Sequence, residues 1–127
     1  MKKLIILILA AMLLTACGQN HNQEMTYMNI TAEEAKEIMD TQQGYVILDV
    51  RAQEEYDQGH IPGAIVIPHE EITEKAEAVL QDKNQLILVY CRSGRRSKIA
   101  ADAMVELGYT NIKEFGGILD WPYEVEG

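Results

Sequence analysis

Cysteine, histidine and positive charge are scarce in this sequence. Its 127 residues include two cysteines and three histidines, which do not cluster at metal-ligand spacing, so a metal site has no support. Eleven basic residues stand against twenty acidic ones, and the formal net charge of −9 argues against general nucleic-acid binding, which needs a basic surface. Internal repeats and low-complexity segments are also lacking, and the length gives room for one domain with a modest core.

The beginning of the chain has the pattern of an export signal. A cationic start precedes an apolar run over 4–14, which is too short to span a membrane, and Leu14-Thr15-Ala16-Cys17 forms a small-residue cleavage site. This segment resembles the bacterial lipoprotein signal, in which cleavage precedes the cysteine and the cysteine is then lipidated. The resemblance implies export and anchoring through Cys17 on the extracytoplasmic side of a membrane, periplasmic or at the cell surface. An ordinary signal peptide with a cysteine near its cleavage site is the alternative.

Cleavage before Cys17 divides the chain into three parts. We expect a signal peptide over 1–16, a lipid-anchored polar linker over 17–26 and the folded domain over 27–127. The mature chain then has 111 residues, with nine basic against twenty acidic ones and a formal net charge of −11. Because Cys17 is acylated in this scheme, Cys91 has no cysteine partner and no disulfide framework exists. A free thiol kept in an oxidising compartment indicates chemistry.

The most informative stretch covers residues 86–97. Residues 86–90 form an apolar run typical of a buried parallel strand, and a helical pattern opens at Ser97 and continues to Leu107. Cys91 is therefore expected as the first residue after the strand, at the sheet edge where α/β folds bind ligands. A helix N-terminus and up to three arginines there favour the thiolate, and loop N–H groups can converge on an anion. The alternative is an inert packing cysteine, for which three arginines are poor neighbours.

Strand-like and helix-like segments alternate along the rest of the domain. Thr31 and Glu34 form a capping box that opens a helix, and Gly59 is placed to end a short one. The alternation predicts an α/β fold with a mostly parallel central sheet and helices on both faces. The expected strands cover 27–30, 45–50, 64–67, 86–90 and 111–115, and the expected helices cover 31–40, 53–58, 70–80 and 97–107.

Six short blocks carry a family resemblance that covers about residues 27–123. They are Leu48–Arg51 (LDVR), Glu54–Tyr56 (EEY), Gly59–Ala64 (GHIPGA), Tyr90–Ser97 (YCRSGRRS), Leu107–Tyr109 (LGY) and Gly116–Trp121 (GGILDW). Each block is weak evidence alone, but their joint order is specific. In that order they resemble a single-domain rhodanese, which implies a rhodanese-like α/β fold.

The resemblance implies a sulfurtransferase that needs no cofactor. Cys91 would attack the outer sulfur of thiosulfate or another sulfane donor, hold that sulfur as a persulfide and pass it to a thiophilic acceptor such as cyanide or a thiol. Covalent catalysis of this kind splits one hard transfer into two easier ones. The cationic loop implies thiosulfate as the first donor to test. The residues implied in binding substrate and persulfide are Arg92, Ser93, Gly94, Arg95, Arg96 and Ser97.

Four matched residues outside the nucleophile invite more than one interpretation. Arg96 either holds the loop by donating to carbonyls and a carboxylate or contacts the anion directly. Asp49 and Arg51 match the family's DxR motif, and Asp49 is expected to brace the loop rather than act as a base. His60 lies in a turn motif, which favours a hydrogen-bonded supporting role over acid–base chemistry.

Two rival functions remain open at this point. Cysteine-dependent phosphatases of a related fold have five residues between Cys and Arg, whereas four separate Cys91 from Arg96, and the shorter loop favours a sulfur atom over a phosphoryl group. A persulfide carrier that serves a protein partner without turnover also fits an intact Cys91. A general redox role is disfavoured because no second cysteine lies nearby to resolve a disulfide.

Overall fold

The computed structural model describes residues 26–127. The expected signal peptide, nearly all of the linker and the lipidation site Cys17 lie outside the described residues. No helix among residues 26–127 is both long and apolar enough to cross a membrane. The elements in chain order are β1 (Met28–Asn29), α1 (Ala32–Thr41), β2 (Val46–Asp49), α2 (Gln53–Gln58), β3 (Ile65–Val66), η1 (His69–Glu71), α3 (Ile72–Val79), β4 (Ile87–Cys91), α4 (Arg95–Glu106), β5 (Ile112–Gly117) and η2 (Ile118–Asp120).

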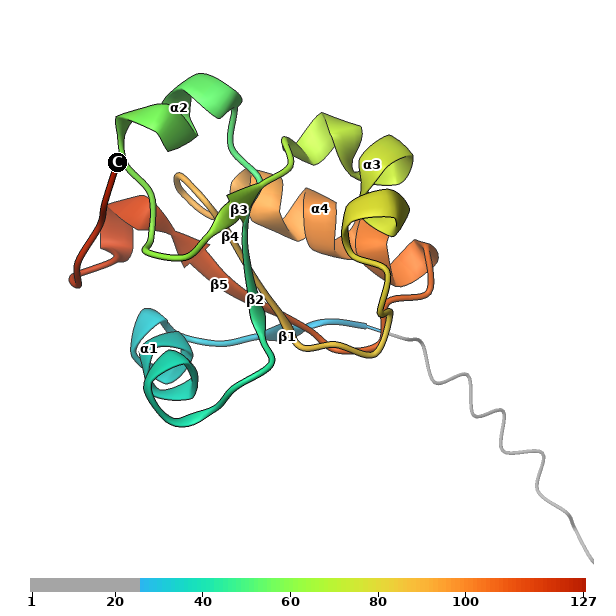
Figure 1. Cartoon of the computed structure of the whole chain (residues 1–127), viewed down its shortest axis with the longest axis horizontal. Coiled ribbons are helices and arrows are strands. Elements are labelled where there is room, and N and C mark those ends of the chain that lie inside the picture. The colour runs from blue at the N-terminus through green and yellow to red at the C-terminus, as the bar shows by residue number, and fades with distance from the viewer. Residues whose placement is uncertain (1–25) are drawn as a thin grey trace, which may run out of the picture.

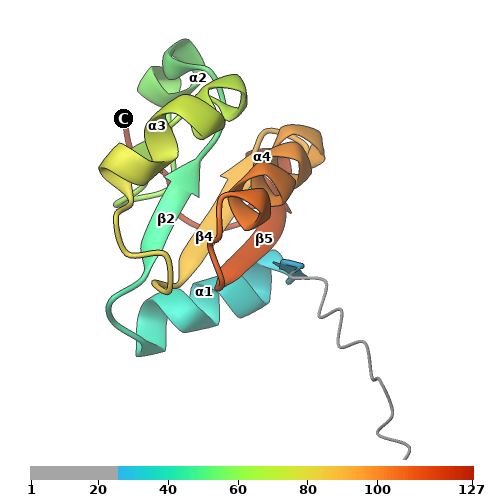
Figure 2. The same cartoon turned by 90° about the vertical axis from the view of Figure 1, so that its right-hand side faces the viewer.

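A five-stranded sheet forms the centre of the domain. Its strand order is β1-β5-β4-β2-β3, and every pairing between neighbours is parallel. Helix α1 covers one face, and α3 and α4 cover the other (Figures 1 and 2). The α/β fold with helices on both faces is thereby confirmed. Because the strands are parallel, the loops that follow β2 and β4 meet at one edge of the sheet, where α2 also lies (Figure 1).

The apolar side chains form one core on each side of the sheet. Along β4 the side chains alternate, as the pleat of a strand requires, so Ile87, Val89 and Cys91 belong to the core beneath α3 and α4. Leu88 and Tyr90 belong to the opposite core, which α1 covers. The alternation places the side chain of Cys91 on the α4 side of the sheet.

Most elements have the positions that local sequence signals predict. The capping box of α1 is present, because Glu34 N–H donates to Thr31 Oγ1 and Thr31 N–H donates to Glu34 Oε1, both at 3.0 Å. Helix α2 ends at Gly59, as expected. The expected helix over 70–80 is divided, since a 3₁₀ turn precedes α3.

Two boundaries at the sheet edge differ from the sequence expectation. Cys91 is the last residue of β4 and pairs with Gly117, so it does not follow the strand. Helix α4 begins at Arg95 rather than Ser97, because Gly94 adopts a left-handed conformation (φ 102°) that turns the chain directly into the helix. Arg95, Arg96 and Ser97 therefore form the first turn of α4.

Candidate active site

Cys91 lies at the carboxyl end of the central strand with its sulfur enclosed. Its exposed fraction is 0%, and its sulfur has two polar neighbours in the next turn. The backbone N–H of Gly94 donates to Sγ at 3.0 Å, and the thiol donates to Ser97 Oγ at 3.3 Å. The thiol is thus buried but not sealed in apolar packing.

A second buried polar group lies behind Ser97. Glu114 of β5 is 2% exposed, and its Oε2 accepts hydrogen bonds from Ser97 Oγ at 2.5 Å and from Gly116 N–H at 2.9 Å. The strand register puts it there, because an irregularity shifts β5 by one residue between the pairs Val89–Glu114 and Cys91–Gly117. Sequence reasoning missed Glu114, since it reaches the hydroxyl of Ser97 only through the pairing of β4 with β5, two strands that α4 separates along the chain.

The three arginines that follow Cys91 have different environments. Arg92 and Arg95 are exposed, whereas Arg96 donates to both carboxylate oxygens of Glu55 in α2, at 2.7 and 3.0 Å. The hydrogen bond from Arg96 lowers the pKa of Glu55 to about 2, and the same bond raises the pKa of Arg96. The loop-holding interpretation of Arg96 expects a carboxylate partner of this kind, and both interpretations of Arg96 stay predictions.

The end of β5 and the segment that follows it pack against the loop after Cys91. Leu119 N–H donates to the carbonyl of Arg92 at 3.2 Å, which ties the loop to η2. Gly117 packs so closely that a Cβ atom built on it would lie 2.0 Å from Arg92 O. The backbone of the loop after Cys91 therefore packs directly against Gly117.

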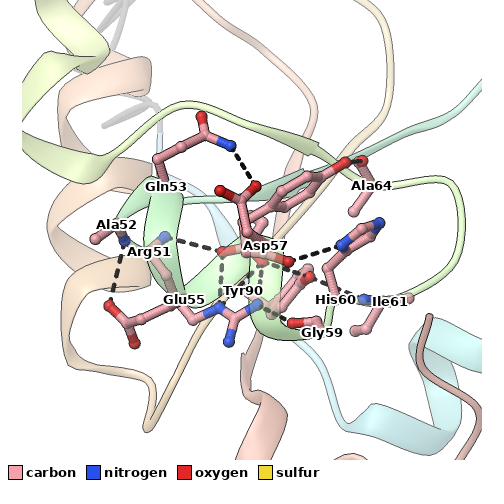
Figure 3. Close-up of polar contacts among 12 residues, drawn as sticks. Arg51, Ala52, Gln53, Glu55, Asp57, Gly59, His60, Ile61, Ala64 and Tyr90 are labelled. Atoms are coloured by element: carbon pink, nitrogen blue, oxygen red, sulfur yellow. Dashed lines mark hydrogen bonds and ion pairs between the residues drawn. The ribbon is translucent and has the colours of Figure 1, made fainter. Parts of the chain in front are cut away.

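Asp49 and Arg51 form a buried ion pair on the other face of the sheet. Arg51 Nη2 and Nε donate to the Asp49 carboxylate at 2.6 and 3.0 Å, and Tyr90 Oη donates to it at 2.7 Å. Burial opposes the charge of Arg51, but the hydrogen bond and charge of Asp49 outweigh it and raise the pKa of Arg51. Arg51 also donates to the carbonyl of Gly59 (Figure 3). Asp49 thus accepts hydrogen bonds from Arg51 and Tyr90, and its role as a brace of the loop stays a prediction.

His60 lies in the turn beyond this ion pair. Its ring stacks on Tyr56, with centroids 3.8 Å apart, and Nδ1 is 2.9 Å from the carbonyl oxygen of Tyr56. Its Nε2 is 3.5 Å from the carboxylate of Glu126. These contacts hold the turn and the last residues of the chain, and none of them reaches Cys91.

An open cavity of about 410 Å³ lies beside the loop. Arg51 and Arg92 bring positive charge to it from the ends of β2 and β4, and Trp121 contributes an apolar wall. Within residues 26–127, no group of three or more His, Cys, Asp and Glu side chains could hold a metal ion. The cavity offers an anionic molecule the unpaired guanidinium of Arg92, whereas Arg51 is engaged by Asp49 and Glu55 brings a carboxylate to the same lining.

Comparison with known proteins shows the family. A model of the rhodanese-like domain matches residues 31–123, so the chain belongs to the rhodanese-like family, and fold and site define a rhodanese-like sulfurtransferase. The thiosulfate sulfurtransferase PspE of Escherichia coli is 42% identical over 73 residues, which cover 58% of this chain and 70% of PspE. The thiosulfate sulfurtransferase GlpE of Coxiella burnetii is 34% identical over 98 residues, which cover 76% of this chain and 89% of GlpE.

The fold is also similar to a solved structure described as a rhodanese with anions from E. coli. That structure has a TM-score of 0.61 and 38% identity, and the match covers 65% of this chain and 96% of the other.

Proposed function

We propose that this protein transfers a sulfane sulfur from thiosulfate through a persulfide on Cys91 to a thiophilic acceptor such as cyanide or a thiol. The observation that carries the proposal is the position of Cys91 at the carboxyl end of β4, with a backbone N–H on its sulfur and with the exposed Arg92 and Arg95 following it in the chain. PspE and GlpE, both named thiosulfate sulfurtransferases, support thiosulfate as the donor.

The proposed reaction has two steps. In the first, the thiolate of Cys91 attacks the outer sulfur of thiosulfate, the sulfur–sulfur bond of the donor breaks, and sulfite leaves with the electron pair. In the second, cyanide attacks the outer sulfur of the persulfide, thiocyanate leaves, and the thiolate is restored. The N–H of Gly94 points at the sulfur on which negative charge is carried in both steps.

Mass spectrometry of the purified protein tests the proposal. After exposure to thiosulfate, the wild type should gain one sulfur atom on Cys91, and cyanide should remove it with formation of thiocyanate. Cys91→Ser should neither gain sulfur nor form thiocyanate, while its circular dichroism spectrum should match that of the wild type. A Cys91→Ser variant that still forms thiocyanate would show that another group carries the reaction.

The burial of Cys91 keeps a second function open, that of a persulfide carrier for a protein partner. Because Cys91 has no exposed surface, this second function expects slow exchange with small acceptors and faster exchange with a partner that opens the loop. Slow turnover with cyanide combined with a persulfide that persists for hours would favour the carrier.

The N-terminal segment supports a proposal about location. We propose that the protein is exported and anchored to a membrane by lipids on Cys17, on the basis of the Leu14–Cys17 pattern. Two or more acyl chains anchor a protein stably, whereas one holds it only marginally. Cys17→Ser should move the protein from the membrane fraction to the soluble fraction of cells. Persistent membrane association of that variant would indicate a different tether.

A further inference from the structure

Residues 92–99, which follow Cys91, expose positive charge and no acidic side chain. Their exposed members are Arg92, Ser93, Arg95, Lys98 and Ile99. Among residues 26–127, no acidic group lies within 4.0 Å of the charged nitrogens of the three basic members. Arg92, Arg95 and Lys98 together form what we call the cationic surface. Its charge is not used inside the domain and is available to a molecule that docks from outside.

Lys98 extends this surface to the residue that contacts the sulfur. A Cβ atom built on Gly94 would lie 3.8 Å from Lys98 Nζ, and the N–H of Gly94 donates to Cys91 Sγ at 3.0 Å. Lys98 also follows Arg95 by three residues in α4, so the two side chains lie on the same face of the helix. Since Cys91 itself has no exposed surface, an acceptor that approaches from solvent meets the residues around the sulfur first.

Exposed apolar side chains border the cationic surface. Leu119 is 62% exposed, and its N–H donates to the carbonyl of Arg92 at 3.2 Å. Ile99, 44% exposed, lies one turn after Arg95 on the same helix face. Val125 is 49% exposed and lines the cavity of about 410 Å³ together with Arg92. Thiosulfate, a small dianion, gains nothing from apolar surface, whereas apolar groups beside arginine are typical of contacts between proteins.

We propose that the cationic surface docks an acidic segment of a partner protein, and that a cysteine in this segment accepts the sulfur from Cys91. The inference rests on the proposed function, for which it names the class of acceptor. In the transfer, the thiolate of the partner attacks the outer sulfur of the Cys91 persulfide. The bond between the two sulfurs breaks, Cys91 leaves with the electron pair as a thiolate, and the partner then carries the persulfide. The step needs neither an oxidant nor a reductant.

The net charge of the chain gives the docking a direction. With a formal net charge of −9, most of the protein repels an acidic segment, and the cationic surface attracts it. Two carboxylates lie nearby, of which Glu55 is engaged by Arg96 and Asp120 is exposed next to Leu119 in the chain. Attraction at one place and repulsion elsewhere orient the partner, because like charges set against each other disfavour the wrong arrangements.

The position of the cationic surface favours a protein over a membrane as the partner. The described chain begins just before β1, in which Met28 pairs with Lys113 of β5. Gly117, the residue that pairs with Cys91, comes four positions after Lys113. The cationic surface therefore lies at the opposite end of the sheet from the start of the described chain (Figure 1). A membrane that holds the proposed lipid anchor on Cys17 is reached from that start.

The test compares two acceptor peptides that differ only in charge. Each has one cysteine, flanked by Asp and Glu in the first peptide and by Asn and Gln in the second. The full chain is loaded with sulfur from inorganic polysulfide, and the loss of that sulfur from Cys91 is followed by mass spectrometry at about 0.05 M salt, where screening is weak. Each rate is divided by the rate at which the same peptide reduces a small neutral disulfide, which corrects for the reactivity of the thiol itself. We expect the wild type to prefer the acidic peptide about tenfold, the combined effect of several exposed charge pairs.

Lysine variants make the result specific to the cationic surface. Lys98→Gln should lower the preference about twofold to fivefold, the range for one exposed ion pair, and Lys98→Glu should lower it further. Lys113→Gln is the matched control, because Lys113 also lacks an acidic partner within residues 26–127 but lies near the start of β5, and it should leave the preference unchanged. The same peptides with serine in place of cysteine, titrated against the unloaded protein, measure the preference as a ratio of dissociation constants even if no persulfide forms.

Equal rates with the two peptides in the wild type would overturn the inference, and so would equal losses in Lys98→Gln and Lys113→Gln. An equally strong preference for mercaptosuccinate over 2-mercaptoethanol would assign the surface to small anionic thiols instead. Sedimentation of Cys17→Ser with phosphatidylglycerol vesicles, lost when Lys98→Gln is added, would assign it to a membrane. Gain of sulfur from thiosulfate, measured separately, decides the proposed function, so the two can fail independently.

Discussion

At the scale of single residues, the segment after Cys91, residues 92–98, differs from the rest of the described domain in how its charged side chains are paired. Most basic side chains in residues 26–127 have an acidic partner within 4.0 Å. Four have none, and three of these four follow Cys91 closely. The four are Arg92, Arg95, Lys98 and Lys113. Free positive charge in an acidic protein is thus concentrated where a dianionic donor would approach.

We therefore expect Arg92→Ala and Arg95→Ala each to raise the KM for thiosulfate about threefold to tenfold with a smaller change in kcat, because they remove attraction without removing the nucleophile. Steady-state kinetics with cyanide as acceptor provide the measurement. Lys75→Ala is the matched control, since Lys75 of α3 is exposed but paired with Glu71 of η1. Equal KM values in wild type and both arginine variants would contradict a donor-attracting role.

At the scale of elements, the end of β5 determines the position of the loop after β4. Gly117 has an extended backbone (φ −130°) that any residue could adopt. Glycine is needed at this position because there is no room for a side chain, and not because of the backbone conformation. An added methyl group there would lie 2.0 Å from Arg92 O and 2.6 Å from the Cα of Ser93. Both neighbours are backbone atoms and cannot rotate away, so the loop itself must move.

Gly117→Ala should accordingly lower kcat by tenfold or more and reduce the free energy of unfolding by about 1–3 kcal/mol, the usual cost of overpacking. Thiocyanate formation and urea unfolding measure the two effects. Gly44→Ala is the control for a glycine substitution as such, because a Cβ at Gly44 meets nothing within 4 Å. It should cost some stability, since φ is +79°, but leave kcat unchanged. A fully active Gly117→Ala would show that the loop tolerates displacement.

The elements also show how far the sequence determines the site. Apolar periodicity, the Thr31 capping box and the glycine after α2 are local signals, and the elements they predict are present in the structure. The start of α4 was wrong by two residues because the sequence does not state that Gly94 takes a left-handed conformation. Glu114 was missed because its position depends on the irregularity in β5. There, residues of β5 pair with residues of β4 that lie 25 or 26 positions earlier in the chain. Local patterns thus pointed to Cys91 at the end of β4 but not to the buried groups behind it.

At the scale of the whole molecule, two opposite electrostatic effects act on an anionic donor. The chain carries a formal net charge of −9, which repels thiosulfate from a distance, while the unpaired arginines attract it at close range. The screening length decides which effect dominates. It is about 30 Å at 0.01 M salt, about 10 Å at 0.1 M and about 3 Å at 1 M. A domain of about 100 residues has a radius of gyration near 13 Å, so its whole charge is felt only at the lowest salt.

The kcat/KM for thiosulfate should therefore pass through a maximum as salt is raised. Between about 0.01 and 0.1 M, added salt screens the distant acidic residues while the arginines beside the sulfur still act, and the rate should rise. Towards 1 M the local attraction is screened as well, and the rate should fall. The double variant Arg92→Ala/Arg95→Ala should keep the rise and lose most of the fall, because only the repulsion is left to screen. A kcat/KM that falls steadily from the lowest salt concentration would show that attraction by the arginines outweighs repulsion by the net charge at every salt concentration.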